Sequence, residues 1–242
     1  MYTTTSISIA VSPTIMIIKV SDNKLLALLH LSSSALPVGT FAYSQGLEFA
    51  LESGWCTTSD EVASWIEANL KFGLGQLDLP IYLRIYQAWF DSDWQRLEHW
   101  NDTLLAFRET KELYLEDTQI GGAFAQWHRG QDQGREQYLG HCIQPTVVAM
   151  HSLAAVISHI EVSAALQGFA WSWVENQITC ASKAMPMGQS DGQRILQALI
   201  PKIGEACQYA MTIDDGDIGT SLVGSAIASS LHEQQYSRLF RS

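Results

Sequence analysis

Apolar positions along this chain recur at three- and four-residue intervals, and short polar joins separate the periodic segments. After the pair Leu79-Pro80, for example, aromatic and aliphatic residues occupy positions 82, 85, 86 and 89. A period near 3.6 is typical of amphipathic helices, and only residues 7–11 hint at the alternation expected of a strand. No linker rich in Pro, Gly or Ser divides the chain. The pattern therefore predicts an all-α fold, a single-domain, bundle-like arrangement of about ten helices.

Local signals place several helix boundaries. Thr58 and Glu61 have the spacing of a capping box, which predicts a helix that continues to about residue 73. Asp78 precedes a helix with proline in its first turn, and Asp217 is suited to cap the last helix. The pair at residues 121–122 is Gly-Gly within a periodic segment. Such a pair permits either a kink or a close contact between helices.

Residues 145–185 form a long apolar region, and no Lys or Arg occurs between Arg135 and Lys183. A membrane span needs about 20 predominantly apolar residues. Two histidines, a glutamate and a glutamine at positions 151, 159, 161 and 167 interrupt every window of that length. We therefore expect two buried helices here and no membrane association.

Residues 36–48 read Leu-Pro-Val-Gly-Thr-Phe-Ala-Tyr-Ser-Gln-Gly-Leu-Glu and combine turn formers with polar and aromatic side chains. Pro37 and Gly39 predict a turn, and Thr40 is suited to cap a helix that continues to about residue 53. Gly46 within that helix indicates that another segment approaches the backbone closely. An ordinary capped hairpin of helices would give the same spacing. On a continuous helix, one side would carry Phe41, Ser44, Gln45 and Glu48, and the more apolar side Tyr43 and Leu47.

The charge balance excludes several classes of partner. The formal net charge is −11, with 14 Lys and Arg in 242 residues. So few cations argue against binding to nucleic acid or to an anionic membrane surface. The balance suits a basic partner or a cationic cargo, although solubility alone would also account for it.

The cysteines and the first residues bear on location. Four cysteines are widely spaced without a Cys-x-x-Cys pair, as expected of buried thiols in a reducing compartment. The first 20 residues lack early Lys or Arg and a cleavage pattern, so they make a poor signal peptide. We expect a cytoplasmic protein in which residues 1–20 are a disordered extension and Met16 is an alternative start to Met1.

The sequence contains partial matches to catalytic and ligand-binding motifs, but each lacks the structural context or a residue that its chemistry requires. Residues 188–192 fit Gly-x-Ser-x-Gly, but that nucleophile motif needs a preceding strand, and a turn capped by Ser190 or Asp191 fits better. An acidic run at residues 214–217 lacks the glutamate that closes a calcium loop, and no phosphate-binding Gly-x-x-x-x-Gly-Lys run occurs. We therefore predict that this chain does not hydrolyse nucleotide by itself.

The seven histidines show no spacing typical of a stable metal site. Glu48, His141 and Cys142 are weak candidates for a transient nickel contact, because these are borderline ligands that nickel accepts. Each is more often a packed or exposed side chain. We predict no stably bound cofactor.

Four short blocks stand in a fixed order along the chain. The first is residues 36–48. The second, Glu-Thr-Lys-Glu-Leu at residues 109–113, is followed by Glu116, Asp117 and Gly121. The third is Met-Pro-Met-Gly-Gln-Ser-Asp-Gly-Gln-Arg at residues 185–194, and the fourth is His-Glu-Gln-Gln-Tyr-Ser-Arg-Leu-Phe-Arg-Ser at residues 232–242. Together these blocks resemble the UreF family of urease accessory proteins. One departure is Lys111, where most members carry Arg, because Lys cannot form the same bidentate fork.

The resemblance implies a non-enzymatic scaffold and not a catalyst. Proteins of this family are expected to dimerise, to bind UreD (also called UreH) and to recruit the GTPase UreG to apo-urease, so that nickel is inserted. Nickel would then be transient cargo at most. A more specific expectation is that the protein modulates the turnover of GTP by UreG. An all-helical domain would comprise residues 21–232, and residues 233–242 would form a tail that docks on a partner.

The resemblance also assigns expected partner contacts. The candidates in the first block are Phe41, Tyr43, Ser44, Gln45 and Glu48. Those in the tail, expected to meet UreD, are Tyr236, Arg238, Leu239, Phe240 and Arg241. The alternative is a helical ligand-binding protein or enzyme that uses its aromatic-rich core as a pocket.

Overall fold

The structure is a computed structural model that describes residues 22–131 and 135–242. Within these ranges there is no strand, which confirms the predicted all-α fold. The expected strand at residues 7–11 and the expected extension at residues 1–20 lie outside the described residues. The α-helices are α1 (Asp22–Leu31), α2 (Leu47–Glu52), α3 (Ser59–Ala68), α4 (Asp78–Asp91), α5 (Trp94–Ala106), α6 (Lys111–Arg129), α7 (Glu136–Leu139), α8 (Val147–Ile157), α9 (Val162–Ala184), α10 (Gln189–Ala210) and α11 (Val223–His232).

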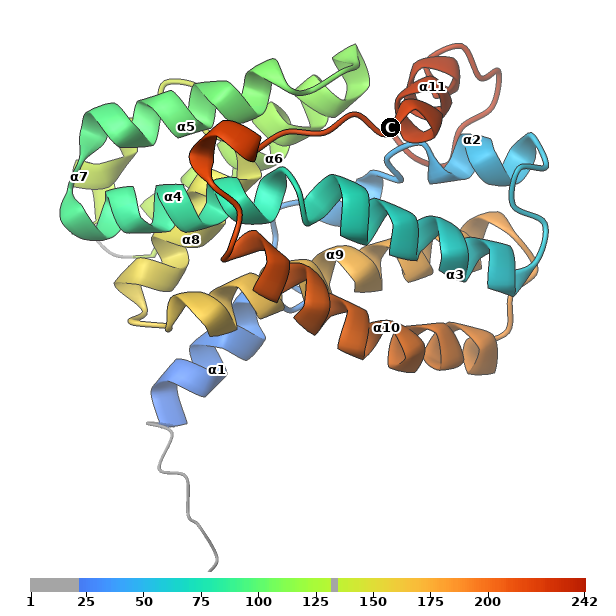
Figure 1. Cartoon of the computed structure of the whole chain (residues 1–242), viewed down its shortest axis with the longest axis horizontal. Coiled ribbons are helices and arrows are strands. Elements are labelled where there is room, and N and C mark those ends of the chain that lie inside the picture. The colour runs from blue at the N-terminus through green and yellow to red at the C-terminus, as the bar shows by residue number, and fades with distance from the viewer. Residues whose placement is uncertain (1–21, 132–134) are drawn as a thin grey trace, which may run out of the picture.

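Helix α9 is central to the arrangement and packs against α1, α2, α4, α8 and α10. Figure 1 shows α3 and α4 crossing one side of the molecule, with α5 and α7 toward one end and α2 and α11 at the other. Helix α6 contacts both α7 and α11. Buried apolar side chains from Leu31 to Phe240 form one continuous cluster. The C-terminal tail therefore contributes to the same core as the first described helix.

The apolar region at residues 145–185 forms the two helices that its interrupted hydropathy predicts, α8 and α9. Helix α8 is apolar on nearly all sides and is almost completely buried. Over the described ranges, no helix combines the length and the apolar character that crossing a bilayer would require.

Two helix starts are confirmed and two are corrected. The capping box of Thr58 and Glu61 is present, and α4 begins at Asp78. Helix α11 begins at Val223, so Asp217 lies in a separate 3₁₀ turn (Asp215–Asp217) and does not cap it. Ser190 and Asp191 do not cap α10 either, because they lie inside its first turn, which starts at Gln189.

The continuous helix expected at residues 40–53 is wrong. A 3₁₀ turn (Thr40–Ala42) and helix α2 are separated by residues 43–46, where Gln45 and Gly46 have φ angles of 55° and 81°. This left-handed conformation cannot continue a right-handed helix. A Cβ added to Gly46 would lie 2.8 Å from the backbone N of Ser229, so the predicted close approach is confirmed, and the approaching segment is α11.

The glycine pair in α6 marks a close contact between helices. A Cβ on Gly121 would lie 1.8 Å from the carbonyl oxygen of Pro145, whereas one on Gly122 would meet nothing within 4 Å. Gly121 therefore allows α6 to lie directly against the segment that leads into α8.

Candidate functional site

The tail folds back onto the segment between the 3₁₀ turn and α2, and its end lies beside α2 and α11 (Figure 1). The backbone N–H of Ser44 donates to the main-chain oxygen of Ser242 at 2.5 Å, and that of Arg241 donates to the carbonyl oxygen of Ala42 at 2.7 Å. The hydroxyl of Ser44 also donates to the Ser242 oxygen, at 2.6 Å. The break in the predicted helix therefore frees backbone groups that pair with the tail.

Glu48 is the main anchor for the tail. Its Oε1 accepts the backbone N–H of Leu239 at 2.7 Å, and its Oε2 accepts that of Phe240 at 3.0 Å. The Nε2 atom of His232 lies 3.0 Å from the same Oε2. Because Glu48 is only 5% exposed, this carboxylate depends on these donors to balance its burial.

Glu112, in the first turn of α6, holds the tail from a second side. Its Oε2 lies 2.9 Å from Nδ1 of His232, and its Oε1 accepts from Arg238 at 2.8 Å. His232 is fully buried, so a carboxylate from α2 and one from α6 meet its two ring nitrogens.

Glu116 lies one turn further along α6 and joins the tail to the first block. Its Oε1 accepts from Nε2 of Gln45 at 2.7 Å, and its Oε2 accepts from the hydroxyl of Ser242 at 2.8 Å. The indole N–H of Trp173, on α9, donates to Oε1 of Gln45 at 2.7 Å. Burial raises the pKa of Glu116 to about 7, although both hydrogen bonds oppose that rise. We call the buried contacts around Glu48, Glu112, Glu116 and His232 the tail joint.

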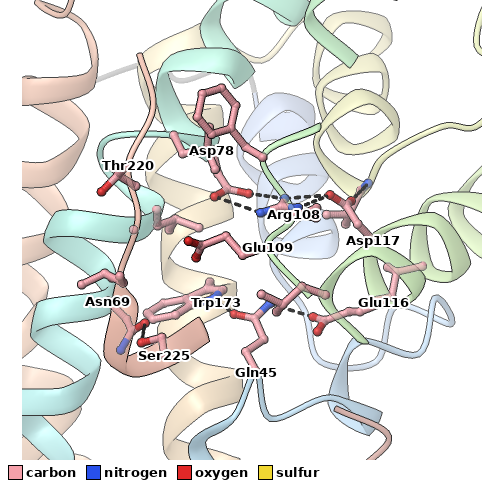
Figure 2. A pocket seen from close by; sticks show the side chains of 18 of the residues that line it. Gln45, Asn69, Asp78, Arg108, Glu109, Glu116, Asp117, Trp173, Thr220 and Ser225 are labelled. Carbon is pink, nitrogen blue, oxygen red and sulfur yellow. Dashed lines mark hydrogen bonds and ion pairs between the residues drawn. The ribbon is translucent and has the colours of Figure 1, made fainter. Parts of the chain in front are cut away.

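A cavity of about 130 Å³ adjoins the tail joint and is shown in Figure 2. Gln45 and Glu116 line it together with Arg108, which lies between two aspartates at one end. Nη2 of Arg108 is 2.6 Å from Asp78 and 2.7 Å from Asp117. Burial alone would lower the pKa of Arg108, but the two carboxylates outweigh it and raise that pKa above its ordinary value. This buried ion triad ties α4, α6 and the loop between α5 and α6 together.

The structure brings both sets of predicted partner residues to one place but does not expose them equally. From the first block, Tyr43, Ser44 and Glu48 are buried, whereas Phe41 and Gln45 are half-buried. In the tail, Phe240 is buried, and the remaining four predicted residues are exposed: Tyr236, Arg238, Leu239 and Arg241. With the tail in this position, Glu48 is occupied by the chain itself and faces no free surface. Partner contact by these residues stays a prediction.

Sequence reasoning missed the roles of His232, Glu112, Glu116 and Arg108. The first three lie within the blocks that carry the family resemblance, so the signal was present. Pairing His232 with Glu48 and Glu112 requires contacts across 184 and 120 positions of the chain, which no local spacing reveals.

The candidate nickel contacts are not assembled. Glu48 lies in the tail joint on α2, whereas His141 and Cys142 follow α7 at the other end of the molecule (Figure 1). The ring of His141 stacks on Trp94 at 3.9 Å, and burial raises the pKa of the Cys142 thiol to about 12. In residues 22–131 and 135–242, no group of three or more His, Cys, Asp or Glu could hold a metal ion.

Two further features singled out in the sequence, Lys111 and the third block, lie outside the tail joint. Lys111 is exposed, and its Nζ lies 3.5 Å from Oε1 of Glu233. A single ammonium group makes this surface ion pair, so it does not need the bidentate fork of an arginine. The third block forms the turn between α9 and the start of α10, where Arg194 contacts Asp60 at 3.0 Å. That block contributes no residue to the tail joint.

Comparison of the sequence with known proteins identifies the family of this chain. A family model described as UreF matches residues 56–200, more than half of the chain. A protein named "Urease accessory protein UreF" from Teredinibacter turnerae is 45% identical over 222 residues, which cover 91% of this chain and 100% of that protein. Proteins of the same name from Chromohalobacter salexigens and Marinobacter nauticus are 44% and 43% identical, covering 90% and 91% of this chain and 94% and 95% of theirs. This chain therefore belongs to the UreF family of urease accessory proteins.

Proposed function

We propose that the protein is a scaffold for urease maturation: it binds UreD through its tail and recruits UreG to apo-urease, where nickel is installed. The observation that carries this proposal is the tail joint. It fixes the backbone of the tail while Tyr236 and Leu239 remain 106% and 68% exposed. Tyrosine is enriched among interface anchors, and a fixed backbone lowers the entropy that binding costs.

The charge of the chain supports a role with cationic cargo. A net charge of −11 would favour the approach of a nickel ion or of a basic partner surface. In this role nickel is cargo that passes between proteins and not a resident cofactor. The proposal includes a cytoplasmic location and a homodimer, both of which the family resemblance implies.

Modulation of UreG turnover is the sharper part of the proposal. It rests on the family role and on the absence of a phosphate-binding motif in this sequence, which leaves nucleotide hydrolysis to UreG. Titrating the purified complex of this protein with UreD into UreG should change the rate of GTP hydrolysis. Unchanged UreG kinetics would refute this part alone.

The scaffold role is tested by the nickel content of urease purified from a host in which this gene is deleted and then restored. Restoration with the unaltered gene should recover the nickel. Tyr236→Ala should restore less and should weaken co-purification with UreD. Tyr209→Ala, which removes an exposed tyrosine from α10, is the matched control and should behave like the unaltered protein. Full nickel loading in the deletion strain would overturn the proposal.

A further inference from the structure

Five carboxyl groups are buried in the described residues, and one of them meets no basic side chain. Four lie 2.6 to 3.0 Å from a nitrogen of Arg108 or His232, namely Glu48, Asp78, Glu112 and Asp117. Glu116 is 6% exposed, and no Lys, Arg or His nitrogen of the described residues lies within ion-pair distance of it. Burial without a cation favours the neutral form of a carboxyl group, so Glu116 is the member of this set suited to hold a proton.

The neighbours of Glu116 determine which of its oxygens can carry that proton. The indole N–H of Trp173 can only donate, so the atom of Gln45 that it meets at 2.7 Å is the amide oxygen. The NH₂ group of Gln45 therefore faces Oε1 of Glu116, which accepts from it. Oε2 lies 2.8 Å from the hydroxyl of Ser242, a group that can donate or accept. A proton on Glu116 thus lies on Oε2, in the contact with the tail.

The tail supplies part of the cover that keeps Glu116 away from water. Ser242, which meets Oε2, is itself only 1% exposed. Arg238 and Arg241 line a surface hollow together with Glu116, so the edge of the tail is also the edge of this cover. If residues 238–242 leave, water reaches the carboxyl group from this side, and its ionisation becomes less costly.

Charged or titratable groups lie around Glu116 on each element that packs there. They are Lys111, Glu112 and Asp117 on α6, Arg108 and Glu109 in the loop before it, Asp78 on α4, Glu48 on α2, His151 on α8, Glu175, Cys180 and Lys183 on α9, His232 on α11, and Glu233, Arg238 and Arg241 in the tail. The cation of Arg108 opposes the burial that raises the pKa of Glu116, but it is shared between the two aspartates that it contacts.

We propose that Glu116 is a proton-dependent switch for the tail, which it holds while Oε2 carries a proton and loosens when that proton leaves. Docking of the tail then takes up one proton from water, and release returns it. The pKa of Glu116 is about 7 with the tail docked against an ordinary 4.5, so docking is strongest below about pH 4.5, weakens up to about pH 7 and is constant above. With these two values, opening of the tail becomes up to about 40-fold easier between pH 5 and pH 7. This inference concerns the chain alone and does not depend on the scaffold role.

The test follows amide hydrogen exchange at Ser44 and Arg241, whose N–H groups bond across the contact between the first block and the tail. Rates of the full chain are measured between pH 5 and pH 7 and divided by the intrinsic rate at each pH, which leaves the opening of the tail. In the unaltered protein, protection should fall by about 10- to 40-fold over this range. Glu116→Gln keeps both hydrogen bonds but cannot ionise, so its protection should fall at least about threefold less.

A control variant and a direct titration complete the test. Glu109→Gln, at an exposed position in the preceding loop, should keep the pH dependence of the unaltered protein. With ¹³C-labelled glutamate, the carboxyl signal of Glu116 is identified by its loss in Glu116→Gln, and its midpoint should lie above about pH 6. A midpoint below that value would overturn the proposal. An equal loss of protection in the unaltered protein and in Glu116→Gln would also overturn it, because another group would then control the tail.

Discussion

Glu48→Gln is the sharpest test of the tail joint, because it changes the charge of one buried side chain and almost nothing of its shape. Oε2 of Glu48 meets two donors, His232 and Phe240, and Oε1 meets one, the N–H of Leu239 at 2.7 Å. The best orientation of the glutamine places its side-chain oxygen where Oε2 of Glu48 lies, because that position meets two donors. Its NH₂ group then faces the N–H of Leu239, so that a donor opposes a donor.

The magnitude follows from these contacts. One hydrogen bond to a charged acceptor is lost, worth about 1.5–3 kcal/mol, and the two that remain weaken because the acceptor becomes neutral. We expect the local opening of the tail to become easier by about 2–4 kcal/mol. Since 1.4 kcal/mol corresponds to a factor of about ten, amide hydrogen exchange at Leu239 and Phe240 should accelerate by roughly 30- to 1,000-fold.

Hydrogen exchange measured by NMR or mass spectrometry checks this expectation. Glu67→Gln is the control, because Glu67 is a surface residue paired with Lys202 at 3.6 Å and should leave exchange in the tail unchanged. If Leu239 and Phe240 exchanged at the same rate in Glu48→Gln as in the unaltered protein, Glu48 would not anchor the tail.

Three further predictions concern stability. The pKa of Glu116 is about 7 in the folded protein against an ordinary 4.5, so between these pH values the native state holds a proton that the unfolded chain has released, and stability falls as pH rises. Glu116→Gln should therefore be more stable than the unaltered protein at about pH 8 but not at about pH 4, as judged by urea unfolding at both pH values. Gly46→Ala should lower the free energy of unfolding by about 2–4 kcal/mol, because it combines a φ of 81° with a contact to α11. Gly54→Ala, with a φ of 75° and nothing within 4 Å, should cost only about 1 kcal/mol, and equal losses in the two denaturation curves would contradict the close-contact argument. Arg108→Met should cost about 3–5 kcal/mol in the same assay, because it leaves two buried aspartates unpaired, and a loss below about 1 kcal/mol would show that the triad contributes little.

Local chemistry in the sequence was enough to predict most helices. The capping box at Thr58 fixes the start of α3 because both of its hydrogen bonds lie within one turn. Likewise, the apolar stretch divides into α8 and α9 at residues 158–161, where His159 and Glu161 interrupt it, whereas His151 and Gln167 lie inside the helices. These predictions hold because the interactions that decide them span only a few residues.

The geometry of the site, in contrast, could not be predicted from local sequence. The sequence named the first block and the tail as important, but it placed the first block on a continuous helix. That helix would have competed with the tail for the backbone of Ser44, and the tertiary structure resolves the competition in favour of the pairing with Ser242. Local propensity cannot predict that outcome, because the competing partner is 198 positions away.

The sequence by itself therefore determined the helical class, the family and the short blocks that matter. Only the tertiary structure decided that those blocks meet around the buried His232, and that Glu48 faces the chain's own tail and not the solvent. The physical reason is that helix formation is governed by neighbours within one turn. A buried carboxylate, in contrast, takes its donors from whichever segments the packing of the core brings within about 3 Å.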